Sequence, residues 1–271
     1  MSHELALTER RTEIDSRLEM VLDAADGQLA PAWTAILERD NRWFGQLLAL
    51  SHNAVAETSD SPVVVPAATA IELLRGYVRL RERLIVQPGD TAADSLQWEV
   101  TSPLLASDFL YTTAYSTLGG LDDNRIGECF EVLTTVSDSI IEALGRTDSQ
   151  STPSSTEYCS FIDDTAGALG RGAAVIGATL ADVDEPDRDH FATLGRGFGT
   201  VCRIRDILAS DGPSVQPGSA PATRRLRQHT KQRLQETDRA LRQLSSAVDG
   251  DSIRTFVAET VSERPADSVV G

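Results

Sequence analysis

The chain has 271 residues, with 41 acidic and 25 basic side chains and a formal net charge of −16 at pH 7. This surplus of negative charge repels nucleic acids and anionic membranes, so we expect neither as a main partner. No apolar run approaches the roughly 18 residues that a membrane span requires, and the first residues are polar. We therefore expect no stable membrane insertion and a cytoplasmic location.

The basic side chains are nearly all arginine, and Lys231 is the single lysine. An acidic, aspartate-rich and lysine-poor surface suggests a salt-adapted cytoplasm. The cysteines, Cys129, Cys159 and Cys202, are widely spaced and include no CxxC pair. We therefore expect buried thiols rather than a zinc site or a disulfide framework.

Apolar residues recur at steps of three and four along most of the chain, which predicts a single all-α domain spanning residues 1–271. The predicted helices are 5–25, 31–55, 68–86, 98–118, 121–145, 158–181, 190–211, 224–247 and 252–264. Pro31 suits the first turn of the second helix, Asp122 or Asp123 can cap the fifth, and Gly145 can end it. We expect an acidic turn over 182–189 and a mobile Pro/Gly/Ser-rich loop over 212–223.

The helices predicted at 158–181 and 190–211 form the centre of the sequence pattern. Arg205 falls on the apolar stripe of the second helix, so it must meet a carboxylate or border a wet cavity. The GRGFG run, Gly195–Gly199, lies inside that helix, is too short for a dinucleotide loop, and predicts close helix packing.

This central region resembles the trans-isoprenyl diphosphate synthases (polyprenyl synthetases), whose late helices read roughly Y..MI.GKTA.L and G..LG.AFQI.DDILD. The corresponding positions here are Tyr158, Ile162, Asp163, Asp164, Thr165, Ala166, Leu169, Gly195, Phe198, Gly199, Cys202, Arg203, Ile204, Arg205, Asp206 and Ile207. Residues 68–86 and 104–118 are similar to two earlier motifs of the family, so the resemblance covers nearly the whole chain. It implies an all-α, isoprenoid-synthase-type helical bundle around a central cavity.

In that family two Asp-rich motifs face each other across the cavity and hold Mg²⁺ on an allylic diphosphate. By this resemblance the first motif falls on Glu82, Arg83 and Val86, which supply one carboxylate where two are needed. The second keeps Asp206 and has Ile207 and Ser210 at its other positions. We therefore predict no metal site.

Other family positions are also altered. A lysine of the family, which binds diphosphate, is replaced here by Asp164, directly before Thr165, and no Gly-Lys-Arg segment occurs near residues 58–66. Asp108 keeps an aspartate of the family. The resemblance places Asp108, Asp164 and Thr165 around the cavity.

Five arginines suggest that this cavity carries positive charge where the cavity of the family carries negative carboxylates. Arg75, Arg79 and Arg83 form an i, i+4, i+8 strip. If Arg203 and Arg205 are opposed to this strip in the bundle, the five arginines would bind a prenyl diphosphate without metal. The alternative, which we favour, is that they pair with carboxylates inside a closed cavity, namely those of Glu72, Glu82, Asp108 and Asp206.

Three functions remain open. The first, which we favour, is a catalytically degenerate homologue that acts as a non-catalytic or regulatory subunit. The family is generally dimeric, so this implies a homodimer or a heterodimer with an active prenyl synthase paralogue. The second is an active polyprenyl (geranylgeranyl-type) diphosphate synthase with a rebuilt site, which alone would require Mg²⁺. The third is a protein that binds a prenyl diphosphate or another lipid.

Overall fold

The structure is a computed structural model that describes residues 3–23, 25, 27–37, 41–55, 61–86, 93–146, 154–209, 220–245 and 248–262. These residues form helices, turns and short connections, and no strand occurs among them. The helices are α1 (His3–Leu22), α2 (Ala30–Leu37), α3 (Trp43–Asn53), α4 (Val64–Val86), α5 (Ala93–Gly119), α6 (Ile126–Gly145), α7 (Ser155–Ile162), α8 (Ala168–Leu180), α9 (Glu185–Ala209), α10 (Ala220–Gln243) and α11 (Gly250–Ser262). Two short helical turns, Gly27–Leu29 and Asp163–Gly167, precede α2 and α8.

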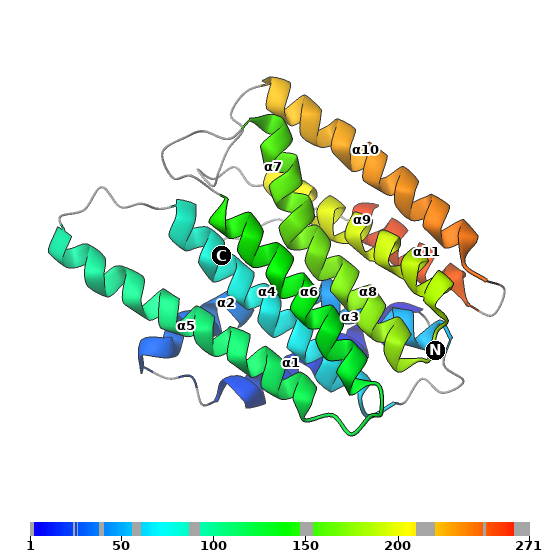
Figure 1. The fold of residues 1–271 in the computed structure, drawn as a ribbon, viewed down its shortest axis with the longest axis horizontal. Coiled ribbons are helices and arrows are strands. Elements are labelled where there is room, and N and C mark those ends of the chain that lie inside the picture. Colours follow the sequence, from blue (N-terminus) through cyan, green and yellow to red (C-terminus); the bar gives the residue numbers. More distant parts are fainter. Residues whose placement is uncertain are drawn as a thin grey trace.

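Two helices lie at the centre of the bundle. Every residue from Trp43 to His52 in α3 is buried, and so is nearly all of α8. Such all-round burial is typical of helices that neighbours cover on every side. Figure 1 shows α8 and α9 side by side, with α10 along the outer edge next to α9 and α5 at the opposite edge.

Helices α8 and α9 approach each other backbone to backbone. A Cβ atom added at Gly195 would lie 2.2 Å from the carbonyl oxygen of Gly170, and one at Gly170 would lie 2.1 Å from that of Gly195. Gly199 is in the same situation against the carbonyl of Ala166. The close packing predicted for the GRGFG run is confirmed, because no larger residue fits between these helices.

The helix predicted over 31–55 is wrong in its continuity, since α2 and α3 are separate. Arg42, immediately before α3, has a left-handed backbone with φ 51°. Its buried guanidinium donates to Oδ1 of Asp15 at 2.5 Å and to the carbonyl of Ile36 at 2.6 Å. The second bond satisfies a carbonyl at the end of α2 that has no partner within its own helix.

The helix predicted over 158–181 contains a π-helical turn at Asp163–Gly167. The hydroxyl of Thr165 donates to the carbonyl of Phe161 at 2.8 Å, within this altered ladder. π turns insert a residue and so re-aim the side chains around them. Here Asp163 contacts Arg233 of α10 as well as α9, whereas Asp164 contacts Arg146, directly after α6, as well as α9.

Several boundaries also differ from prediction. The acidic turn is shorter than 182–189 because α9 already begins at Glu185. Residues 220–223 of the predicted loop belong to α10, where Pro221 is tolerated in the first turn, and 212–219 lie outside the described residues. Helix α6 begins at Ile126, and the carboxylate of Asp123 accepts from the backbone N–H of Arg125 rather than capping a helix from residue 121.

Candidate functional site

An ion pair joins α4 and α9, the two helices on which the resemblance places the Asp-rich positions. Nη2 of Arg203, on α9, donates to Oε2 of Glu82, on α4, at 2.6 Å, although the two residues are 121 positions apart. The side chain of Glu82 is 12% exposed and that of Arg203 38%. The carboxylate of Glu82 raises the pKa of the Arg203 guanidinium, so the guanidinium keeps its positive charge.

Tyr158 of α7 lies close enough to this pair to interact with both charges. Burial raises the pKa of Tyr158 to about 12, with Arg203 lowering it and Glu82 raising it. The phenol is therefore neutral at any ordinary pH. It therefore adds no third charge near the ion pair.

Arg205 and Asp206 lie further along α9. Nη2 of Arg205 is 3.3 Å from Oδ1 of Asp206, and Nη1 donates to the backbone carbonyl of Thr260 in α11. The guanidinium also lies over the ring of Trp43, 5.9 Å from its centroid. Arg205 thus contacts a carboxylate, as expected for a charged residue on an apolar stripe. Through Thr260 and Trp43 it also connects α9 to α11 and α3.

The arginine strip of α4 faces three different environments. Arg75 is buried, lies 3.3 Å from Glu72 and stands over the ring of Phe44 at 5.1 Å. Arg79 donates to the carbonyl of Ala35 at 3.1 Å. Arg83 is exposed in the last turn of the helix. The strip therefore does not present three parallel guanidinium groups to one ligand.

The remaining predicted site residues do not converge. Asp108 is 57% exposed and accepts from Arg81 at 2.5 Å. Asp164 pairs with Arg146 and Arg196, at 2.7 and 3.1 Å. Thr165 is fully buried within the π turn. Val86 is the last residue of α4, Ile207 packs on a small cluster around Tyr158, and Ser210 lies outside the described residues.

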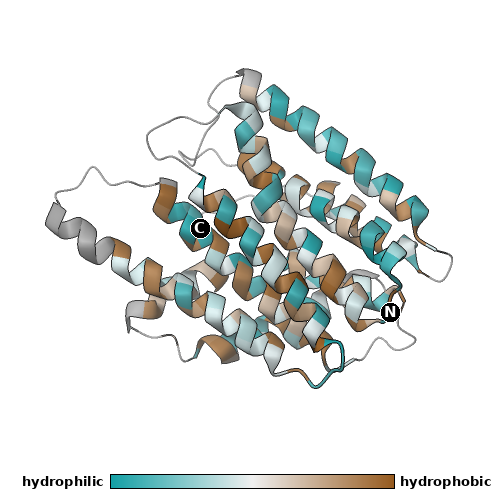
Figure 2. Cartoon of the chain, viewed as in Figure 1, coloured by the Kyte–Doolittle hydropathy of each residue, from teal (hydrophilic) through white to brown (hydrophobic). Residues whose placement is uncertain are grey.

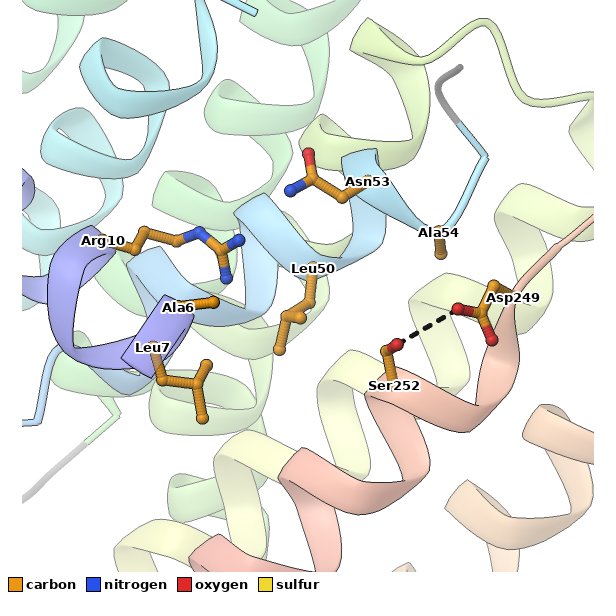
Figure 3. A pocket seen from close by; sticks show the side chains of 8 residues that line it. All are labelled: Ala6, Leu7, Arg10, Leu50, Asn53, Ala54, Asp249 and Ser252. Atoms are coloured by element: carbon orange, nitrogen blue, oxygen red, sulfur yellow. Dashed lines mark hydrogen bonds between the residues drawn. The ribbon is translucent and has the colours of Figure 1, made fainter. Parts of the chain in front are cut away.

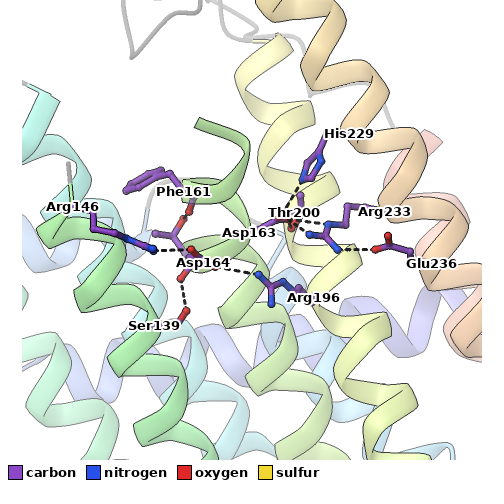
Figure 4. Close-up of polar contacts among 11 residues, drawn as sticks. Ser139, Arg146, Phe161, Asp163, Asp164, Arg196, Thr200, His229, Arg233 and Glu236 are labelled. Carbon is purple, nitrogen blue, oxygen red and sulfur yellow. Dashed lines mark hydrogen bonds and ion pairs between the residues drawn. The ribbon is translucent and has the colours of Figure 1, made fainter. Parts of the chain in front are cut away.

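The largest polar cluster in the described chain is centred on Asp163, which the sequence analysis matched to a family motif but did not name as a site residue (Figure 4). Its carboxylate accepts from Thr200 of α9 at 2.8 Å, from His229 of α10 at 3.0 Å and from two nitrogens of Arg233. Burial alone would raise the pKa of Asp163, but these bonds outweigh it and lower the pKa to about 2. Glu236 accepts a further bond from Arg233 at 2.6 Å.

One signal in the sequence points to this cluster. The buried side of α10 begins with Ala222 and Leu226 and ends with Ala240 and Leu241. Between them, His229 and Arg233 stand at helical spacing where apolar residues would continue the stripe. Polar residues on a buried stripe require a buried partner, and Asp163 is that partner.

A pocket of about 170 Å³ lies at the C-terminal end of α3, beside Leu50, Asn53 and Ala54 (Figure 3). Its lining combines apolar side chains with Arg10, Asn53 and the start of α11. Burial lowers the pKa of Arg10. No residue of the predicted site lines it.

The described residues between α4 and α9 do not fit a magnesium ion. Mg²⁺ takes oxygen ligands, mostly carboxylates, waters and phosphate. The carboxylates placed here by the resemblance are Glu82 and Asp206, and each is already paired with an arginine. Within the described part of the chain, no group of three or more His, Cys, Asp and Glu side chains could hold a metal.

Comparison with known proteins gives a partial match in sequence. No family model matches the chain. It is 26% identical over 155 residues to the short chain isoprenyl diphosphate synthase of Methanocaldococcus jannaschii, covering 54% of this chain and 47% of that protein. The chain thus spans about half the length of the curated relative that it matches.

Solved structures match over nearly the full chain. The geranylgeranyl pyrophosphate synthetases of Geoglobus acetivorans and Pyrococcus horikoshii Ot3 give TM-scores of 0.76 and 0.74 at 17% identity, each covering 96% of this chain and 99% and 98% of their own. The geranyl diphosphate synthase small subunit of Antirrhinum majus gives 0.72 at 16% identity, covering 95% of this chain and 99% of its own. The predicted fold class is confirmed: the chain has the all-α prenyl diphosphate synthase fold.

The curated match and the solved structures are all prenyl diphosphate synthases or subunits of them, to which this chain is similar in about half of its sequence and in its fold. No described helix is both long enough and apolar enough to cross a membrane.

Proposed function

We propose that this chain is a non-catalytic subunit of a prenyl diphosphate synthase, one that pairs with an active paralogue and adjusts its rate or product length. The observation that carries the proposal is the Arg203–Glu82 ion pair between α9 and α4. By the resemblance, these helices would hold metal ions between facing carboxylates. In this chain the guanidinium of Arg203 on α9 instead contacts the carboxylate of Glu82 on α4.

The chemistry of prenyl transfer explains why a guanidinium in place of a metal-binding carboxylate matters. The reaction begins by breaking a carbon–oxygen bond, and metal ions stabilise the diphosphate that leaves. Arg203 carries one positive charge, and Glu82 neutralises it at 2.6 Å. The pair therefore offers little net charge to a leaving diphosphate, and it removes a carboxylate that could bind metal.

The similarity to a protein named as a small subunit of a geranyl diphosphate synthase also supports the proposal. That likeness concerns the fold, and the subunit role is our inference. A homodimer or a heterodimer with an active paralogue is part of the same proposal.

The test is an activity assay on the purified chain. It would receive Mg²⁺, labelled isopentenyl diphosphate and a series of allylic diphosphates, first alone and then mixed with an active geranylgeranyl diphosphate synthase from the same cell. We expect no product from the chain alone and an altered rate or product length in the mixture. Product from the chain alone would overturn the proposal in favour of an active synthase with a rebuilt site.

If the chain forms no product alone and changes nothing in the mixture, the proposal is also overturned, and a protein that only binds a prenyl diphosphate or lipid is favoured.

The Arg203→Gln variant provides a control for the site itself. Removing the guanidinium frees Glu82, so we expect the variant to bind Mg²⁺ more tightly than the wild type in calorimetry. Equal metal binding by both proteins would show that Arg203 is not what excludes the ion.

A further inference from the structure

The pocket between α1, the end of α3 and the start of α11 contains a buried cation with an unused hydrogen-bond donor. Nη1 of Arg10 is buried and has no hydrogen-bond partner in the described part of the chain. The carboxylate of Glu13 acts to raise the pKa of Arg10, but burial lowers it by more. A buried N–H group without an acceptor costs free energy, so this donor indicates an acceptor that comes from outside the chain.

The unused donor sets Arg10 apart from other polar side chains. Hydrophilic residues dominate α10 at the outer edge of the bundle, where many are exposed and can bond to water (Figure 2). Among the described residues, the other arginines with an unbonded buried nitrogen have it at Nε, which carries a single hydrogen. Four of these contact a carboxylate through Nη, namely Arg81, Arg188, Arg196 and Arg205. Arg10 instead leaves a terminal nitrogen with two hydrogens unbonded.

The surroundings of Arg10 leave this nitrogen to an occupant of the pocket. Figure 3 shows the guanidinium of Arg10 on one side of Leu50 and the carboxylate of Asp249 on the other. The amide of Asn53 satisfies both of its polar atoms when its oxygen accepts from Nη2 of Arg10 at 3.1 Å. That bond holds one terminal nitrogen of the guanidinium and leaves Nη1 unbonded.

The opposite wall of the pocket carries a negative charge. The carboxylate of Asp249 accepts from the backbone N–H of Asp251 and from the hydroxyl of Ser252, both at 3.1 Å. Its backbone N–H donates to the carbonyl of Ala54 at 2.7 Å, which holds this wall against the end of α3. A carboxylate offers about four lone-pair sites, so Asp249 can accept further bonds.

We propose that this pocket binds a small zwitterion, a free α-amino acid with a short aliphatic side chain. Its carboxylate accepts from Nη1 of Arg10, its ammonium donates to Asp249, and its side chain contacts the apolar lining, which is Ala6, Leu7, Leu50 and Ala54. A dry cavity of about 150 Å³ holds benzene, so the space of about 170 Å³ suits an amino acid of the size of valine. A ligand with one charge fits less well, because Asp249 repels an anion and Arg10 repels a cation.

The experiment is isothermal titration calorimetry on the full chain with L-valine and two analogues that each lack one charge. 3-Methylbutanoate has no ammonium, and 2-methylpropylamine has no carboxylate. We expect L-valine to bind with a Kd of about 1 mM or tighter. The exposed Asp249 contributes modestly, so 3-methylbutanoate should bind about three- to fivefold more weakly. The amine lacks an acceptor for Arg10 and should not bind measurably.

Three variants assign these effects to the two charged walls. Arg10→Met keeps an apolar stem and removes the donor, so L-valine should bind at least about tenfold more weakly. Arg11→Met is the matched control on the same helix, because Arg11 contacts Asp15 and Asn41 outside the pocket, and it should bind as the wild type does. Asp249→Asn keeps an acceptor at the start of α11, and in this variant L-valine and 3-methylbutanoate should bind equally.

A fourth variant tests the space without changing a charge. Ala6→Leu adds three carbon atoms to the lining and should abolish binding of L-valine. Circular dichroism would verify that every variant folds. In thermal unfolding, L-valine should raise the Tm of the wild type and leave that of Arg10→Met unchanged.

The proposal is overturned if L-valine does not bind the wild type, if it binds Arg10→Met or Ala6→Leu unchanged, or if the amine binds as well as L-valine. Equal binding of 3-methylbutanoate and L-valine to the wild type would also overturn it and leave a site for carboxylates alone. The measurement uses no synthase and no prenyl substrate, so its failure leaves the proposed subunit function untouched, and the reverse also holds.

Discussion

Replacing Asp163 by asparagine removes one charge from the most fully bonded carboxylate in the described chain. The pKa of Asp163 falls from an ordinary 3.8 to about 2 in the folded protein. At 1.36 kcal/mol per pH unit, this difference corresponds to about 2.4 kcal/mol of stability from the ionised form. Asparagine also turns its NH₂ group towards donors, so we expect the free energy of unfolding to fall by about 2 to 3 kcal/mol at pH 7.

The same shift predicts a pH dependence. Because the folded pKa of Asp163 is lowered, its stabilisation is fully present above about pH 4 and is lost as the pH falls through 2. Urea unfolding of wild type and variant at pH 7, 5 and 3 measures this difference. It should be constant between pH 7 and 5 and about half as large at pH 3.

The neighbouring residue gives a matched control. Asp164 also pairs with two arginines, but their side chains are 63% and 41% exposed. Exposed ion pairs contribute little, so Asp164→Asn should cost less than about 1 kcal/mol. A cost for Asp163→Asn no larger than this control, or one that does not change with pH, would refute the role given to the buried network.

Three further predictions concern other parts of the molecule. Gly195→Ala puts a Cβ 2.2 Å from a carbonyl oxygen of α8, so it should lower the free energy of unfolding, measured in urea, by about 3 kcal/mol or more. The control Gly127→Ala has nothing within 4 Å of its new Cβ and should raise the free energy of unfolding by about 0.5 to 1 kcal/mol. Equal effects of the two variants would contradict the close packing of α8 and α9. Glu82→Gln should lower the pKa of Tyr158 from about 12, seen as earlier phenolate absorbance in a titration against the wild type, and an unchanged curve would argue against their proximity. Cys129 is 0% exposed, and its burial raises the pKa of the thiol to about 12. Ellman's reagent at pH 8 should therefore label this thiol only after denaturation, and fast labelling in the native protein would contradict the prediction.

The sequence alone determined the fold class and the main packing faces. Apolar residues at helical spacing are a local property of the chain, so they predicted nearly every helix. The glycines at 195 and 199 predicted close packing because a glycine inside a helix is otherwise unfavourable. The sequence also shows directly that two positions matched to metal ligands by the resemblance hold Arg83 and Ile207, whose side chains do not bind a cation.

Only the tertiary structure decided which charges meet. Glu82 and Arg203 are 121 positions apart, and Asp163 and Arg233 are 70 apart, so no local pattern could pair them. The left-handed Arg42 that divides the second predicted helix depends on Asp15, 27 positions earlier. Ion pairs and backbone breaks of this kind depend on distances of a few ångströms between helices. Spacing along one helix specifies which face is buried, but not which residue of another helix lies against it.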